Sequence, residues 1–154
     1  MIKVAVESPH QDEVAALLSQ SDAVAAALYP GAFRRAITPA SLDATGISLF
    51  VARSAGHAIG CCALFDRGDG TAEIKRMIVD EAHRGSGAGA ALLAALEAEA
   101  TRRGIHRLLL EVGIRNEAAY ALYYRAGFMP CAAFAPYKPD PISRFLAKSV
   151  SAKG

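Results

Sequence analysis

The chain has 154 residues, of which 53% are apolar and 21% are charged, and its mean hydropathy is +0.22. These values are typical of one folded domain over residues 1–154 and exclude a disordered chain. The formal net charge is +2, and no basic run is longer than a pair such as Arg102 and Arg103. We therefore expect no nucleic-acid partner.

The sequence also has no strong signal for membrane insertion, secretion or metal binding. The longest apolar run, residues 87–96, is much shorter than the roughly 18 to 20 residues that span a bilayer, and the N-terminus lacks the apolar stretch of a signal peptide. We therefore expect a cytoplasmic protein without a membrane partner. Cys61, Cys62 and Cys131 are predicted to be reduced core residues, and no His or Cys pair has metal-site spacing, so no metal is expected.

The first half of the chain is predicted to form a helix and an antiparallel sheet. Ile2–Val6 is rich in β-branched residues and indicates a strand. The alanine and leucine content of Asp12–Leu28 indicates a helix, in one piece or in two because Ser21 and Asp22 could cap a new start, and a Tyr-Pro-Gly stop follows at residues 29–31. Three strands separated by short turns follow, at Ile47–Arg53, Ala58–Phe65 and Thr71–Val79.

The second half alternates helices and strands. Leucines at positions 92, 93 and 96 share a helical face with Ala100, and this helix is predicted to end at residues 102–104. The apolar segment Arg107–Val112 predicts a strand parallel to the one before the helix, in a βαβ unit. We then expect a helix over Asn116–Ala126 with Asn116 as its N-terminal cap, a strand from Phe128 onward and an edge strand over Ser143–Val150.

A glycine-rich turn lies between the predicted strand Thr71–Val79 and the next helix. Its sequence at residues 84–89 is Arg-Gly-Ser-Gly-Ala-Gly. A helix N-terminus presents N–H groups without partners, and glycines let an anion approach the backbone closely. The turn therefore predicts a phosphate or pyrophosphate site. Because no Lys-Ser or Lys-Thr follows the glycines, a Walker loop is excluded.

A dinucleotide-binding fold is the alternative for this turn, because Gly85, Gly87 and Ala90 fit the G-x-G-x-x-[GA] pattern and Glu111 ends the following strand. However, five residues separate Val79 from the first glycine, whereas that fingerprint turns directly out of its strand. A meander of hairpins precedes the turn, and too little chain follows to build a second nucleotide-binding half.

Two motifs resemble those of the GCN5-related N-acetyltransferases. Arg84, Gly87 and Gly89 fit the family's phosphate motif [QR]-x-x-G-x-[GA]. The family motif N-x-x-A-x-x-L-Y-x-x-x-G-F follows without a gap, formed by Asn116, Ala119, Leu122, Tyr123, Gly127 and Phe128. The resemblance covers residues 72–128 well, and the first 60 residues only in general layout.

This resemblance implies a fold of the α/β (α+β) class: a mixed, mostly antiparallel central sheet of six to seven strands, with a splayed parallel pair and about four helices. It also implies an enzyme that moves the acetyl group of acetyl-CoA directly to a primary amine of a small molecule or peptide, in a ternary complex. Backbone groups of residues 77–79 would pair with the pantetheine amides, as in the family's splayed strand. The residues expected to bind the cofactor are Met77, Ile78, Val79, Arg84, Gly85, Ser86, Gly87, Ala88, Gly89, Ala90, Asn116 and Tyr123.

Two side chains are candidates for proton transfer. The resemblance places the family's general-acid tyrosine at Tyr123, where a phenol can protonate the leaving thiolate; the alternative is a tyrosine that packs its helix onto the sheet. Glu73 lies eleven residues before Arg84, the spacing of the strand glutamate base in the histone-acetylating branch of the family. The alternative for Glu73 is a solvated or ion-paired strand residue beside Lys75 and Arg76.

The C-terminal segment carries a second resemblance. Residues 137–148 look like the Y-x-x-D-P-x-S-x-F-M-x-K ending of a group of small bacterial acetyltransferases, with Leu146 at the methionine position. The acceptor amine is left open by the sequence, as is the choice between a monomer and a homodimer. A non-catalytic acetyl-CoA sensor is the alternative function, because the fold could bind the cofactor without turnover.

Overall fold

The structure, a computed structural model, describes residues 1–31 and 38–150. The strands of this part of the chain are β1 (Ile2–Val6), β2 (Ile47–Ser54), β3 (His57–Asp66), β4 (Thr71–Val79), β5 (Arg107–Gly113), β6 (Met129–Pro130) and β7 (Ser143–Ser149). Its α-helices are α1 (Asp12–Leu28), α2 (Ala88–Arg102) and α3 (Glu117–Arg125). Short 3-10 helices lie at Pro39–Leu42 and Glu81–His83.

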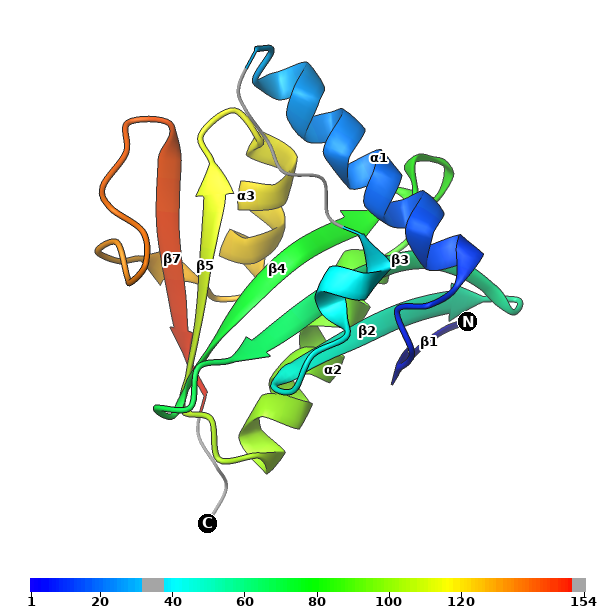
Figure 1. Cartoon of the computed structure of the whole chain (residues 1–154), viewed down its shortest axis with the longest axis horizontal. Helices are drawn as coiled ribbons and strands as arrows, with labels where there is room; N and C mark the ends of the chain where they lie inside the picture. The colour runs from blue at the N-terminus through cyan, green and yellow to red at the C-terminus, as the bar shows by residue number, and fades with distance from the viewer. Residues whose placement is uncertain (32–37, 151–154) are drawn as a thin grey trace.

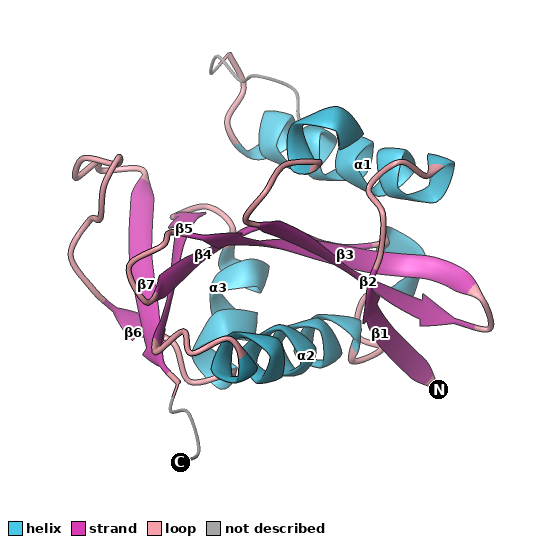
Figure 2. Cartoon of the chain, turned by 60° about the horizontal axis from the view of Figure 1, so that its bottom comes forward, coloured by secondary structure: helices cyan, strands magenta, loops and turns pink. Residues whose placement is uncertain are grey.

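The strands form one mixed sheet with the order β1-β2-β3-β4-β5-β7-β6. Neighbouring strands are antiparallel except β4 and β5, which are parallel and connected through α2, as predicted for a βαβ unit. Helix α1 covers one face of the sheet, and α2 and α3 cover the other (Figure 2). The predicted α+β architecture is confirmed, with three α-helices in the described residues and about four helices expected.

The parallel pair separates soon after it begins. β4 and β5 pair only over Thr71–Glu73 and Arg107–Leu109, and the two strands then diverge (Figure 1). On the other side of β4, the register with β3 shifts between Cys61 and Ala63, next to Arg76, which has a φ of +59°. This irregularity is a β-bulge, with a non-glycine residue in the left-handed region. The two irregularities together open the centre of the sheet.

The bulge decides which face of the sheet each side chain of β4 reaches. Ile74 and Ile78 are four positions apart and would share a face in a regular strand. Instead, Ile74 packs in the core beneath α2 with Leu92 and Leu96, whereas Ile78 packs in the core beneath α1 with Val14. The extra residue in the bulge therefore reverses the alternation of β4 halfway along the strand.

Two local predictions can now be settled. Helix α1 runs in one piece through residues 21–22, and the side chain of Asp22 does not cap a second helix but pairs with Arg76 of β4 (3.6 Å). The last strand, β7, is not the edge of the sheet, because β6 pairs with it at Leu146 and Ala147. The strand expected from Phe128 onward is this two-residue β6.

Candidate active site

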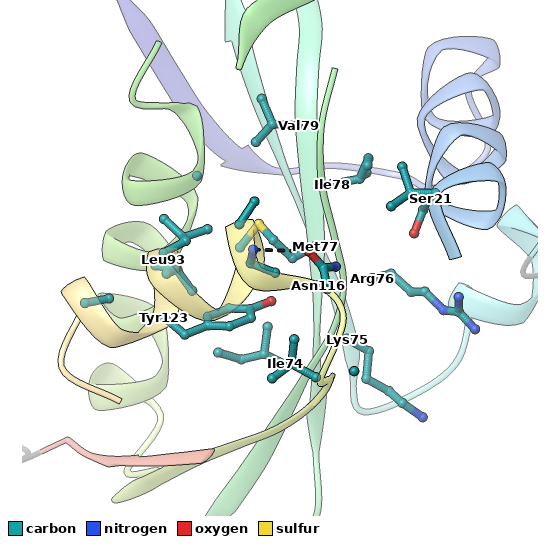
Figure 3. A pocket seen from close by; sticks show the side chains of 18 of the residues that line it. Ser21, Ile74, Lys75, Arg76, Met77, Ile78, Val79, Leu93, Asn116 and Tyr123 are labelled. Atoms are coloured by element: carbon teal, nitrogen blue, oxygen red, sulfur yellow. Dashed lines mark hydrogen bonds between the residues drawn. The ribbon is translucent and has the colours of Figure 1, made fainter. Parts of the chain in front are cut away.

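A cavity of about 1070 Å³ lies where β4 and β5 diverge. It extends from the start of α2, along the second half of β4, to the C-terminal half of α1. Figure 3 shows Tyr123 and Leu93 on one side of β4, and Ser21, Lys75 and Arg76 on the other. The cavity therefore has walls on both faces of the sheet. We call these two parts the α2 side and the α1 side.

The α2 side begins at the glycine-rich turn. Gly85 and Gly87 have φ angles of +81° and +91°, a conformation that glycine adopts without strain. Gly87 is the N-cap of α2, and no side chain caps the first N–H groups of the helix. Residues 87–90 line the cavity. These N–H groups and the helix dipole therefore form a site suited to an anion.

The residues of the turn do not all serve this site in the same way. Gly89 lies within α2, and a Cβ there would come within 2.8 Å of Leu122 Cδ2 in α3, so its small size lets the two helices pack closely. Ser86 does not line the cavity, and its N–H donates to the carbonyl of His83 (3.2 Å). The other predicted cofactor residues all line the cavity: Met77, Ile78, Val79, Arg84, Gly85, Gly87, Ala88, Gly89, Ala90, Asn116 and Tyr123.

The backbone of β4 is open toward the cavity. Its pairing with β5 ends at Glu73, so the β5-facing N–H and C=O groups of residues 77–79 have no strand partner within the described residues. Backbone polar groups next to a cavity can be satisfied by a ligand, as they are when an extended peptide adds to a sheet edge. An elongated ligand with amide groups fits this strand.

Tyr123 lies in α3, on the α2 side, and is 6% exposed. Its ring packs against Phe128, with the centroids 5.8 Å apart, and Figure 3 shows its hydroxyl directed toward β4. Burial raises the pKa of the Tyr123 hydroxyl above its usual value, so the group keeps its proton at neutral pH. Asn116 caps α3 as predicted, because its side chain accepts a hydrogen bond from the N–H of Ala119 (3.2 Å). Tyr123 therefore packs its helix and directs a protonated hydroxyl toward β4.

Glu73 is also buried, at 6% exposure, and lines the cavity. Its Oε2 accepts a hydrogen bond from the hydroxyl of Tyr137 (2.6 Å). Burial and this hydrogen bond raise the pKa of Tyr137, so the tyrosine remains a donor at neutral pH. Among the residues that the structure describes, Glu73 forms no salt bridge. The solvated or ion-paired alternative for Glu73 is therefore wrong.

Tyr137 is a cavity residue that the sequence analysis did not identify. It comes from the loop between β6 and β7, where its ring contacts Phe134 (5.3 Å between centroids) and Phe145 (5.7 Å). The signal was present, because Tyr137 begins the segment that resembles a known ending of small bacterial acetyltransferases. Lys148 at the end of that segment bonds to Glu97 of α2 (2.8 Å), which anchors β7 to the helix layer.

The cysteines are not part of the site. Cys61 and Cys62 are buried in β3, Cys131 is partly exposed, all three are free, and none lines the cavity. Burial raises the pKa of Cys61 to about 12 and also raises that of Cys62, so neither thiol is ionised at neutral pH. Within residues 1–31 and 38–150, no group of three His, Cys, Asp or Glu side chains is placed to hold a metal ion. In the same residues, no helix combines the length and apolar character needed to cross a membrane.

Known proteins are similar to this chain in sequence and in fold. Residues 16–128 match the acetyltransferase (GNAT) family. An IAA acetyltransferase from Azospirillum brasilense is 38% identical over 148 residues, which cover 96% of this chain and 97% of that protein. A solved structure from Klebsiella pneumoniae, described as an acyl-CoA N-acyltransferase, is 38% identical with a TM-score of 0.83, over 97% of this chain and 98% of that one.

A more distant structure shows the same fold with a ligand. An acetyltransferase from Salmonella typhimurium, solved with its cofactor acetyl-CoA, is 21% identical with a TM-score of 0.70, over 99% of this chain and 95% of that one. The dinucleotide-binding alternative is wrong, because the sheet has one splayed parallel pair and not a doubly wound parallel order. The prediction of an acetyltransferase is confirmed: the chain belongs to the acetyltransferase (GNAT) family.

Proposed function

We propose that the protein transfers the acetyl group of acetyl-CoA directly to a primary amine while both substrates are bound. The observation that carries this proposal is one continuous cavity, which joins the anion site at the start of α2 to the buried carboxyl group of Glu73. A cofactor with phosphates at one end and a thioester at the other requires an elongated site of this kind. The opening between β4 and β5 gives its reactive end access to the α1 side.

The α2 side has groups that suit each part of acetyl-CoA. The N–H groups of residues 88–90 would hold the pyrophosphate, with Arg84 at the same end of the cavity. The backbone of residues 77–79 would pair with the pantetheine amides in place of a strand. This arrangement leaves the sulfur beside α3, where Tyr123 is the available proton donor.

The residues on the two sides of β4 then have complementary tasks. Acetyl-CoA supplies the thioester. Glu73 takes a proton from the ammonium form of the acceptor, directly or through solvent, and the free nitrogen attacks the carbonyl carbon. As the nitrogen–carbon bond forms and the carbon–sulfur bond breaks, Tyr123 protonates the departing sulfur, and the second amine proton leaves to solvent. No acyl group is attached to the protein, consistent with the buried, un-ionised thiols.

The test is acetyl-CoA-dependent thiol release, measured against a panel of amino acids, polyamines, aminoglycosides and peptides. We expect release with at least one class of amine, together with acetyl-CoA binding in a calorimetric titration. A non-catalytic sensor would bind acetyl-CoA and release no thiol with any amine, and that result would overturn the proposal. We further propose that the protein works in the cytoplasm, supported by its three free cysteines, and as a monomer or a homodimer.

A further inference from the structure

The α1 side of the cavity carries two basic side chains in a row. Lys75 and Arg76 are adjacent in β4 and would point to opposite faces of a regular strand. Because of the bulge, both reach the α1 side (Figure 3). Arg76 pairs with Asp22 of α1 (3.6 Å), and Lys75 lies against Phe65, a partly buried residue that packs against the core beneath α1. Both also line the cavity.

The ammonium group of Lys75 lies near aromatic rings and does not pair with a carboxylate of the described residues. Its Nζ lies 5.0 Å from the ring centroid of Phe65 and 6.0 Å from that of Tyr137. Among the residues that the structure describes, no Asp or Glu forms a salt bridge with it. Lys75 is half-buried and lines the cavity, and an ammonium group in such a place is suited to binding an anion from a ligand.

The opposite charge lies close to Lys75 without neutralising it. Glu73 is two residues away on the same strand, and the hydroxyl of Tyr137 holds its carboxyl group (2.6 Å). Tyr137 therefore contacts both groups, with its hydroxyl on Glu73 and its ring beside Lys75. The other carboxyl group of this wall, that of Glu111, accepts a hydrogen bond from Ser143 (2.6 Å). The carboxyl group of Glu73 and the ammonium group of Lys75 thus belong to residues that line the same cavity without forming a salt bridge with each other in the described part of the chain.

We propose that the acceptor is a small zwitterion: a primary amine that carries a carboxylate, as in an amino acid. Its ammonium group lies at Glu73, and its carboxylate lies at Lys75, with Arg76 adding positive charge on the same side. This inference rests on the proposed acetyl transfer and specifies its substrate class. A polyamine or an aminoglycoside lacks the carboxylate that Lys75 would bind.

The experiment compares matched acceptors. Each amino acid is assayed beside its amide and its decarboxylated amine, whose amine groups are respectively less basic and more basic than that of the parent. We expect kcat/KM for the amino acid to exceed both analogues by about tenfold or more, the usual loss when a charged partner is left unpaired. Equal or faster acetylation of either analogue would overturn the inference, while the proposed function would stand. No acetylation of any amine would overturn both.

Variants of Lys75 then assign the effect to this side chain. Lys75→Gln should raise KM for the amino acid about tenfold and reduce the preference over its amide, with KM for acetyl-CoA unchanged. Lys75→Arg should keep most of the preference. Lys138→Gln is the matched control, because Lys138 is exposed, adjacent to Tyr137 and absent from the cavity wall. If Lys75→Gln acts equally on the amino acid and its amide, the carboxylate does not bind at Lys75.

Discussion

The α2 side and the α1 side of the cavity are built from the chain in different ways. The α2 side uses two short contiguous segments, residues 84–90 and 116–123, and its main contribution is backbone N–H groups at a helix start. The α1 side combines side chains that are far apart in sequence, such as Ser21, Lys75 and Tyr137. A local motif can therefore identify the first side, whereas only the folded chain assembles the second.

The two sides of the cavity would also differ in what they recognise: the cofactor on the α2 side and the acceptor on the α1 side. At the start of α2, backbone N–H groups can recognise an anion without the help of a particular side chain. In our proposal, recognition on the α1 side depends on the identities of a few side chains, including Glu73 and Lys75. Substitutions on the α1 side should therefore change the acceptor without changing the cofactor, and the following predictions test that separation.

The largest effect is expected from Tyr123→Phe. The ring still packs against Phe128, so acetyl-CoA affinity should be preserved, while loss of the proton donor should lower kcat about a hundredfold. A timed assay of thiol release measures kcat, and calorimetry on the same sample measures the affinity for acetyl-CoA. A wild-type kcat would show that the sulfur is protonated by another group. Tyr124→Phe is the control, because that ring is 61% exposed and does not line the cavity.

Glu73→Gln should have the next largest effect, about tenfold or more on turnover near neutral pH. The loss should be greatest at low pH and should shrink as the pH approaches the pKa of the acceptor amine, because a free amine needs no base. Tyr123→Phe should show no such recovery. A rate close to wild type, with a parallel pH profile, would make Glu73 a structural residue of the strand.

Ala90→Glu tests the anion site without altering the glycines of the turn. Ala90 is exposed in the first turn of α2, where a carboxylate favours the helix dipole but repels a pyrophosphate. Acetyl-CoA affinity should fall about tenfold, while the melting temperature of the free protein should not decrease. Ala98→Glu places the same charge on an exposed position of the same helix, away from the cavity, and should leave affinity unchanged.

The smallest effect is expected from Arg53→Met, on stability alone. Arg53 joins β2 to Glu7 (2.9 Å) and to Glu13 of α1 (3.0 Å), and its hydrogen bonds lower the pKa of Glu7. The variant should lose about 1 kcal/mol of unfolding free energy at neutral pH. The loss is small because the Arg53–Glu7 ion pair is partly exposed to solvent. A lowered pKa stabilises the fold above the usual pKa of glutamate, and this contribution disappears as the pH falls through the lowered value. Denaturant titrations should therefore show a smaller difference in unfolding free energy between the variant and the wild type at acidic pH than at neutral pH. The acetyl-CoA affinity of the variant should be unchanged at neutral pH.

Much of the fold could be predicted from the sequence, because its elements have strong local signals. The bounds of α1 and β4 agree with the prediction, and the βαβ unit was identified from apolar periodicity and one turn. The bulge at Arg76 could not be predicted, because no glycine or proline marks it and it depends on pairing with β3. Without the bulge, Lys75 and Arg76 cannot be placed on one face.

In the candidate site, too, features that depend on local contacts could be predicted from the sequence, and features that depend on distant contacts could not. Asn116 as a helix cap and the turn before α2 depend on neighbours a few residues away, and both were predicted. The hydrogen bond from Tyr137 to Glu73 joins residues 64 positions apart, so sequence spacing carried no information about it. From the sequence, Glu73 was either a base or a solvated or ion-paired strand residue, and the folded chain pairs it with Tyr137 and pairs Arg76 with Asp22.

If the cofactor binds along β4, the early divergence of β4 from β5 would make the stability of the protein depend on the cofactor concentration. Where a sheet normally continues, half of β4 lacks its neighbour on one side, and a bound cofactor would take the place of that neighbour. A ligand that binds only the folded state adds RT ln(1 + [L]/Kd) to its stability, about 2.7 kcal/mol at a hundred times Kd. Amide hydrogen exchange in residues 74–79 should then slow as acetyl-CoA is added. The resistance of this enzyme to unfolding and proteolysis would rise and fall with the acetyl-CoA supply of the cell.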